Sequence, residues 1–122
     1  GQENQKIYDL INKFFKILNN ENWEIDYVHW EFSLLKFIGF DLNIAEYCKY
    51  EIIGNEKKYF IESTFKKIIV PNFLIENSSE NVTNKDIFNS LNLISEYLKK
   101  NILIPNNINF PFSRDNFIKY FK

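Results

Sequence analysis

The side chains that could do chemistry in this chain are few, and they do not form a catalytic set. His29 is the only histidine and Cys48 the only cysteine. A Cys–His dyad would therefore have to join two separate segments, and no third group is evident to orient the histidine. Carboxylate pairs such as Glu24 and Asp26 are the raw material of acid–base sites, but solvated helix faces carry the same pairs. We expect no enzyme activity.

Cofactor and metal sites are also not expected. Glycine occurs only at positions 1, 39 and 54, which leaves no Gly-rich loop to hold a phosphate or a dinucleotide. A single cysteine can form neither an intrachain disulfide nor a zinc site made of cysteines alone. The cysteine usage is typical of an intracellular protein.

The charge balance does not favour strong binding of nucleic acid. Lys and Arg total 15 against 16 Asp and Glu, which gives a formal net charge of −1. Binding through release of counterions from phosphates needs a positive surface. Only one of the cations is an arginine, Arg114, and arginine is the usual bidentate partner of carboxylates and phosphates. Arg114 is thus a candidate anion contact, with capping or solvation at a helix start as the structural alternative.

The N-terminal third is predicted to form two helices. Apolar residues recur at helical spacing from Glu3 to Asn20, and an Asn-rich turn follows. A second helix is predicted from Trp23 to Ile38, closed by Gly39 as a left-handed cap. Because this second helix is apolar on most sides, it should lie at the centre of its domain or reserve one face for a partner.

The middle of the chain changes character. The runs Tyr50–Ile53, Lys58–Ile61 and Phe65–Val70, with a Gly-Asn turn after the first, predict short strands. Pro71 ends the last of them. We predict a small β-rich insert at about residues 48–71.

Two more helices are expected in the C-terminal part. Thr83 and Asp86 have the spacing of a helix start, and a buried stripe continues from there to Ile102. A short final helix, Arg114 to Phe121, would be capped by Ser113. Together these elements predict a mainly α fold, a small helical bundle with a short β-rich insert.

Several segments resemble RecO recombination mediators. The stretch Trp-Glu-Phe-Ser-Leu-Leu-Lys-Phe-Ile-Gly-Phe-Asp-Leu-Asn that starts at Trp30, followed by Cys48, resembles the central helix of RecO. Further matches follow in the family's order: Val70 to Leu74, which is similar to the Leu-Pro-x-Phe-Leu turn of the alphaproteobacterial branch; Leu98 to Leu103 with Pro105; and Ser113-Arg114-Asp115. The resemblance implies that residues 1–122 form one domain, the helical C-terminal domain of RecO.

Two departures limit what the resemblance implies. Many RecO proteins bind zinc through four cysteines in the insert, whereas here only Cys48 remains and Glu51 stands where its CxxC partner would be. No zinc is expected in this branch. The N-terminal OB-fold with which the family binds DNA is also missing, so DNA is expected to be held mainly through that absent domain.

The function implied by the resemblance is protein docking in DNA repair. RecO helps displace single-strand-binding protein, anneals complementary strands and, with RecR, loads RecA. We expect a non-catalytic interaction domain in the bacterial cytoplasm, associated with the nucleoid and not with a membrane. Its partners would be RecR and the tail of single-strand-binding protein. The alternative is a helical adaptor or scaffold subunit of another complex.

A site can be carried over from family members that bind the acidic tail of single-strand-binding protein. In these members the final Phe of the tail enters an apolar pocket and a cationic group meets the carboxylate. The candidate residues here are His29, Trp30, Leu34, Lys36, Phe37 and Arg114. The apolar ones suit a core equally well. His29 stands where relatives can have Arg and carries less charge near neutral pH, so Lys36 and Arg114 are its possible substitutes.

Overall fold

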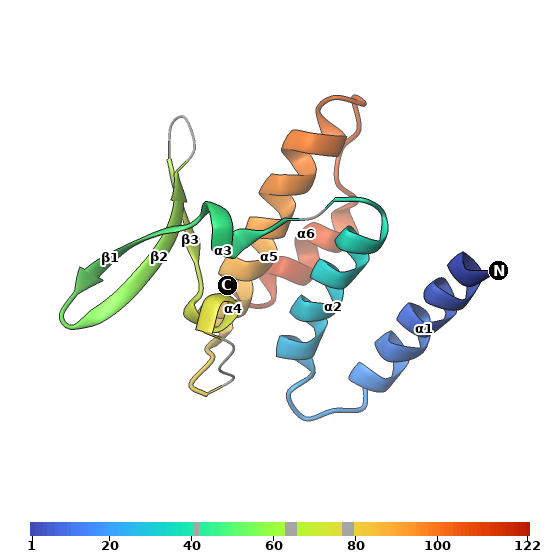
Figure 1. Cartoon of the computed structure of the whole chain (residues 1–122), viewed down its shortest axis with the longest axis horizontal. Coiled ribbons are helices and arrows are strands. Elements are labelled where there is room, and N and C mark those ends of the chain that lie inside the picture. Colours follow the sequence, from blue (N-terminus) through green and yellow to red (C-terminus); the bar gives the residue numbers. More distant parts are fainter. Residues whose placement is uncertain (41, 63–65, 77–79) are drawn as a thin grey trace. The chain divides into compact units, whose positions relative to one another are not determined.

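The computed structural model describes residues 1–40, 42–62, 66–76 and 80–122, apart from the side chain of Glu3. The described chain divides into two compact units, Gly1–Leu42 and Asn43–Lys122. The elements of each unit are shown in Figure 1. Helices dominate and one small sheet is present, which confirms the predicted mainly α fold with a β-rich insert.

The first unit is a pair of helices, α1 (Gln2–Ile17) and α2 (Trp23–Phe37), joined by a short turn. Both predicted helices are confirmed to within a few residues. Gly39 follows the C-cap of α2 with φ of +97°, a backbone conformation that side-chain-bearing residues rarely adopt. The predicted left-handed closure of this helix is therefore confirmed.

The second unit begins with a short helix, α3 (Ile44–Tyr47), and a three-stranded antiparallel sheet. The strands are β1 (Lys49–Ile53), β2 (Glu56–Glu62) and β3 (Lys67–Val70), in the order β1-β2-β3. Gly54 and Asn55 join β1 to β2 with φ of +58° and +70°, as a two-residue hairpin turn with positive φ requires. Phe65, where the third strand was predicted to start, lies outside the described residues.

The described residues of the second unit also form the helical segments α4 (Asn72–Glu76), α5 (Asn84–Leu98), a π-helical turn η1 (Lys99–Leu103) and α6 (Phe112–Lys119). The capping box of α5 is present, since Thr83 Oγ1 accepts a hydrogen bond from the Asp86 amide at 3.2 Å. The helix α5 packs against β3 and α6. Among the buried residues of this unit are Val70, Phe73, Ile87, Leu91, Leu93, Ile94, Ile118 and Phe121.

The predicted cap of the last helix is wrong. Ser113 lies inside α6, which begins at Phe112 and has Pro111 as its N-cap without a side-chain hydrogen bond. The fixed φ of proline, here −62°, leads directly into a helix without a capping side chain. No described helix has the length and apolar character needed to cross a membrane.

Candidate functional site

A groove of about 310 Å³ lies between α1 and α2, and every residue that lines it belongs to the first unit. Its apolar lining consists of Leu10, Ile17 and Trp30. Its basic lining consists of Lys13, Lys16 and His29, and Asn20, Asp26 and Ser33 complete the wall. The groove thus combines an apolar surface with a surplus of cationic side chains.

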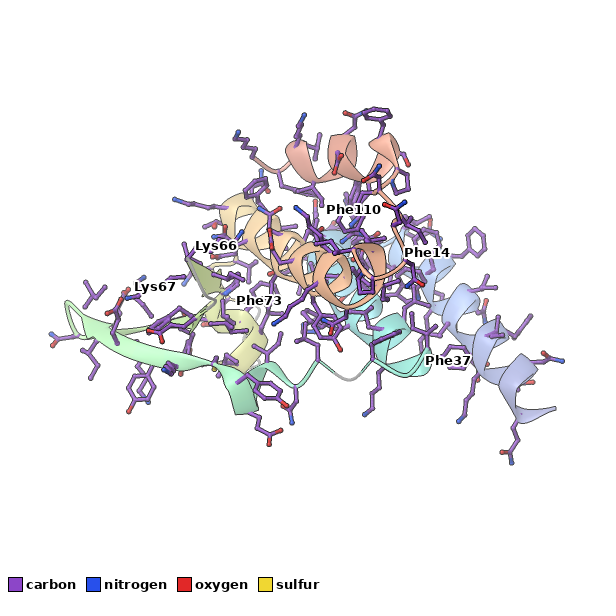
Figure 2. All side chains as sticks on the ribbon, turned by 90° about the horizontal axis from the view of Figure 1, so that it is seen from above. Phe14, Phe37, Lys66, Lys67, Phe73 and Phe110 are labelled. Carbon is purple, nitrogen blue, oxygen red and sulfur yellow. The ribbon has the colours of Figure 1, made fainter. Side chains whose placement is uncertain are left out.

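Trp30 is held in a fixed orientation at this groove. Its indole Nε1 donates a hydrogen bond to the backbone carbonyl of Leu10 at 2.8 Å. Its ring centroid lies 5.0 Å from that of Phe14 and 5.9 Å from that of Tyr27, on which it stacks. Phe14, labelled in Figure 2, brings α1 into this aromatic cluster. Such a ring offers a preformed apolar surface with little entropy left to lose on binding.

The two groove lysines are available to an anionic partner. Lys13 and Lys16 are exposed, and within the described part of the chain neither forms an ion pair. The single carboxylate of the groove, Asp26, accepts a hydrogen bond from the side-chain amide of Asn20 at 3.2 Å. With His29 counted as neutral, the groove still has more positive than negative groups.

The sequence-predicted residues of α2 fall into two sets. His29 and Trp30 line the groove. Leu34, Lys36 and Phe37 do not line it; Leu34 and Phe37 are partly buried and Lys36 is exposed in the last turn of the helix. Figure 2 labels Phe37 at this end of α2.

Arg114 lies in the second unit and its guanidinium is engaged there. Its Nε donates a hydrogen bond to Ser95 Oγ at 3.2 Å. The guanidinium carbon lies 5.6 Å from the ring centroid of Phe110, within the range of a cation–π contact. These contacts link the start of α6 to α5 and to the segment before α6.

Sequence reasoning missed Lys13 and Lys16. The signal was nevertheless in the spacing. Leu10, Lys13 and Ile17 are separated by three and four residues and so fall on one row of a helix. What the sequence alone could not show is that this row faces α2.

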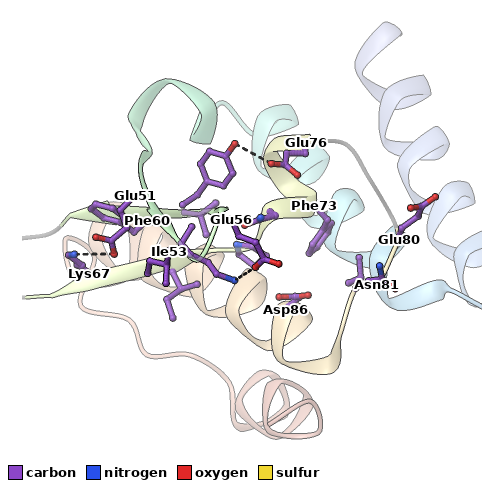
Figure 3. Close-up of a pocket in the computed structure, with 17 residues that line it drawn as sticks. Glu51, Ile53, Glu56, Phe60, Lys67, Phe73, Glu76, Glu80, Asn81 and Asp86 are labelled. Carbon is purple, nitrogen blue, oxygen red and sulfur yellow. Dashed lines mark hydrogen bonds and ion pairs between the residues drawn. The ribbon is translucent and has the colours of Figure 1, made fainter.

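A larger hollow of about 610 Å³ in the second unit lies between the sheet, α4 and the start of α5 (Figure 3). Carboxylates line it, but most are engaged by neighbours. The contacts are Glu51 with Lys67 at 3.6 Å, Glu56 with Lys58 at 3.2 Å, and Glu76 with the Tyr59 hydroxyl at 3.3 Å. Burial, and after it the Glu76 carboxylate, raises the pKa of Tyr59. We interpret this hollow as a structural network of ion pairs and hydrogen bonds.

Cys48 is a partly buried free thiol whose Sγ lies 3.9 Å from the carbonyl oxygen of Ala45. Across the described residues, no three His, Cys, Asp or Glu side chains gather in a way that could hold a metal ion.

The chain is similar to a known DNA repair protein. It is 26% identical over 132 aligned positions to DNA repair protein RecO of Bartonella tribocorum, an alignment that covers 95% of this chain and 52% of the relative. The chain therefore spans about half the length of the curated relative it matches. No protein-family model matches, and neither does any solved structure. The similarity confirms the RecO resemblance predicted from the sequence.

Proposed function

We propose that this RecO-like chain acts in DNA repair and recombination as a non-catalytic docking module, and that the groove between α1 and α2 receives the acidic C-terminal tail of single-strand-binding protein. The likeness to a protein named DNA repair protein RecO supports the repair role. The groove supports the tail, because it places apolar and cationic side chains side by side.

The apolar part of the groove suits the terminal Phe of such a tail. Leu10, Ile17 and Trp30 form this part, and the indole is already oriented by its bond to the Leu10 carbonyl. A volume of about 310 Å³ is at the small end of ligand pockets. It fits one aromatic side chain, with the rest of the tail lying over the groove rim.

The cationic part suits the carboxylates of the tail. Lys13 and Lys16 are exposed, and His29 stands on the facing helix. Because these cations are exposed, their attraction for an acidic peptide is screened by salt. The tail should therefore be attracted through charge and retained mainly through its Phe.

The other roles in the proposal rest on the RecO likeness alone. RecR is the proposed second partner, and assistance to RecA loading and strand annealing in the bacterial cytoplasm is the proposed outcome. DNA itself would be held mainly by the OB-fold that RecO proteins carry in their N-terminal part.

A helical adaptor in another complex is the second candidate function, and one face of α1 favours it. Ile7, Ile11 and Phe15 are spaced by four residues and are 43%, 50% and 61% exposed. Such a stripe is typical of a helix that packs against a partner. Ile11→Ser with Phe15→Ser should then abolish partner binding, whereas changes to the groove lysines should not.

The docking proposal is tested with a labelled tail peptide, followed by fluorescence anisotropy. We expect a Kd in the micromolar range, about −8 kcal/mol, and no measurable binding of a matched peptide that lacks the terminal Phe. Doubly substituted Lys13→Ala/Lys16→Ala should bind about tenfold more weakly. Lys6→Ala/Lys85→Ala removes two exposed lysines outside the groove and controls for net charge. The proposal is contradicted if both double variants lose the same affinity for the tail, or if the intact tail does not bind at millimolar concentration.

A further inference from the structure

The outer edge of β1 is an open strand edge. In the described part of the chain β1 pairs with β2 only, which leaves its other edge without a neighbouring strand. All five of its residues are exposed. The backbone amides and carbonyls along such an edge can pair with another strand.

The edge has few of the features that usually block pairing. Proteins protect open edges with proline, bulges or lysine. The strand contains no proline, and its pairing with β2 is regular along all five residues. Its apolar side chains are well exposed: Tyr50 by 56%, Ile52 by 67% and Ile53 by 56%. Its two charged residues, Lys49 and Glu51, are opposite in sign.

We propose that β1 pairs antiparallel with β1 of a second copy of this chain, so that two three-stranded sheets become one continuous six-stranded sheet. Residues opposite each other in an antiparallel pair point to the same face. A two-fold axis relates the two identical strands and keeps each residue on its own face of the sheet. The central residue of the pairing must therefore lie opposite the same residue of the second copy.

Two registers pair five residues of each strand: one is centred on Glu51 and uses residues 49–53, and the other is centred on Tyr50 and uses residues 48–52. Charge favours one of them. A register centred on Glu51 would place it opposite the partner's Glu51, and like charges directly opposite are destabilising. A register centred on Tyr50 places Lys49 opposite the partner's Glu51, twice by symmetry, and joins the two tyrosine rings. Cys48 has extended backbone angles, φ −81° and ψ 149°, so the strand can continue to it.

The charged residues are already placed on the face where this pairing needs them. Lys49 pairs with Glu62 at 3.0 Å and Glu51 with Lys67 at 3.6 Å within one chain. Addition of the second strand extends these contacts into alternating charges across the joined sheet. One strand pair is a small interface, so we expect a weak dimer.

A charge exchange tests the register. Sedimentation velocity over a concentration series should show dimer formation by the wild-type chain. Lys49→Glu and Glu51→Lys should each weaken the dimer about tenfold, and the double variant should restore it. Both changes also disturb the contacts with Glu62 and Lys67, so thermal melts report folding separately. A wild-type chain that remains monomeric at millimolar concentration, or a double variant as weak as each single one, overturns the proposal.

Cysteine cross-linking tests the same register without altering charge pairs. In a Cys48→Ser background, Tyr50→Cys should form an interchain disulfide rapidly on mild oxidation, because position 50 faces itself. Ile53→Cys in that background is the matched control, since it lies on the same strand and is equally exposed. Equal rates of disulfide formation in the two variants would show that the cross-links arise from random collisions, and this would overturn the proposal.

Discussion

The indole Nε1 of Trp30 and the backbone carbonyl of Leu10 are joined by a hydrogen bond of 2.8 Å that links α2 to α1. The bond connects residues twenty positions apart in the sequence and lies at the groove that we propose as the docking site. The same contact therefore holds the helix pair together and orients one wall of the groove.

Trp30→Phe should lower the free energy of unfolding by about 1 kcal/mol, the usual net value of one hydrogen bond. The change removes the donor and keeps an aromatic ring against Phe14 and Tyr27. Urea denaturation followed by circular dichroism measures the loss. Trp23→Phe is the control, since Trp23 packs near Tyr27 but does not line the groove. If Trp30→Phe is as stable as wild type, the bond to Leu10 does not hold the helices together.

Thr83→Ala should destabilise the second unit by about 1 kcal/mol, because it removes the side chain that accepts the Asp86 amide. Asp86→Ala should cost a similar amount, since its carboxylate accepts the Thr83 amide at 3.0 Å. The two residues form one reciprocal capping box. The double variant should therefore cost less than the sum of the two single losses; strict additivity in thermal melts would count against a shared box.

The raised pKa of Tyr59 predicts a loss of stability at alkaline pH. In the unfolded chain this hydroxyl titrates near its ordinary value of 10.0. In the folded chain burial, and then Glu76, favour the neutral form. As the pH rises above 10, the unfolded state releases its proton first, so the free energy of unfolding falls until the folded pKa is reached.

Thermal melts between pH 8 and pH 11 measure this effect. Tyr59→Phe should be less stable than wild type at pH 8, because it lacks the hydrogen bond to Glu76, and the difference should narrow as the pH rises. Tyr8→Phe, at a site 63% exposed, is the control, and its stability should change with pH in the same way as that of wild type. A stability difference between Tyr59→Phe and wild type that does not change with pH would contradict the raised pKa of Tyr59.

Much of the fold could be predicted because it depends on local signals. Gly39, the Gly54-Asn55 turn and the Thr83–Asp86 pair each act within a few residues, and each lies where the sequence placed it. The short helices α3 and α4 were not predicted, since four or five residues are too few to show a period. The cap at Ser113 failed because Pro111 already fixes the backbone that enters the helix.

The site could be predicted only in part, because a groove depends on how two helices meet. His29 and Trp30 were named from the RecO resemblance and do line the groove. Lys13 and Lys16 were missed because helical spacing shows which residues share a face, not which face meets a neighbour. The bond between Trp30 and Leu10 had no sequence signal at all, since its acceptor is a backbone carbonyl.

The central claim is that the groove between α1 and α2 binds the acidic tail, and NMR tests it most directly. In a titration of the ¹⁵N-labelled chain with the tail peptide, the indole signal of Trp30 and the amides of Lys13, Lys16 and His29 should shift together and saturate at one affinity. The indole of Trp23, which does not line the groove, should move much less. Binding that leaves the Trp30 indole unmoved and shifts signals of the second unit instead would contradict the claim.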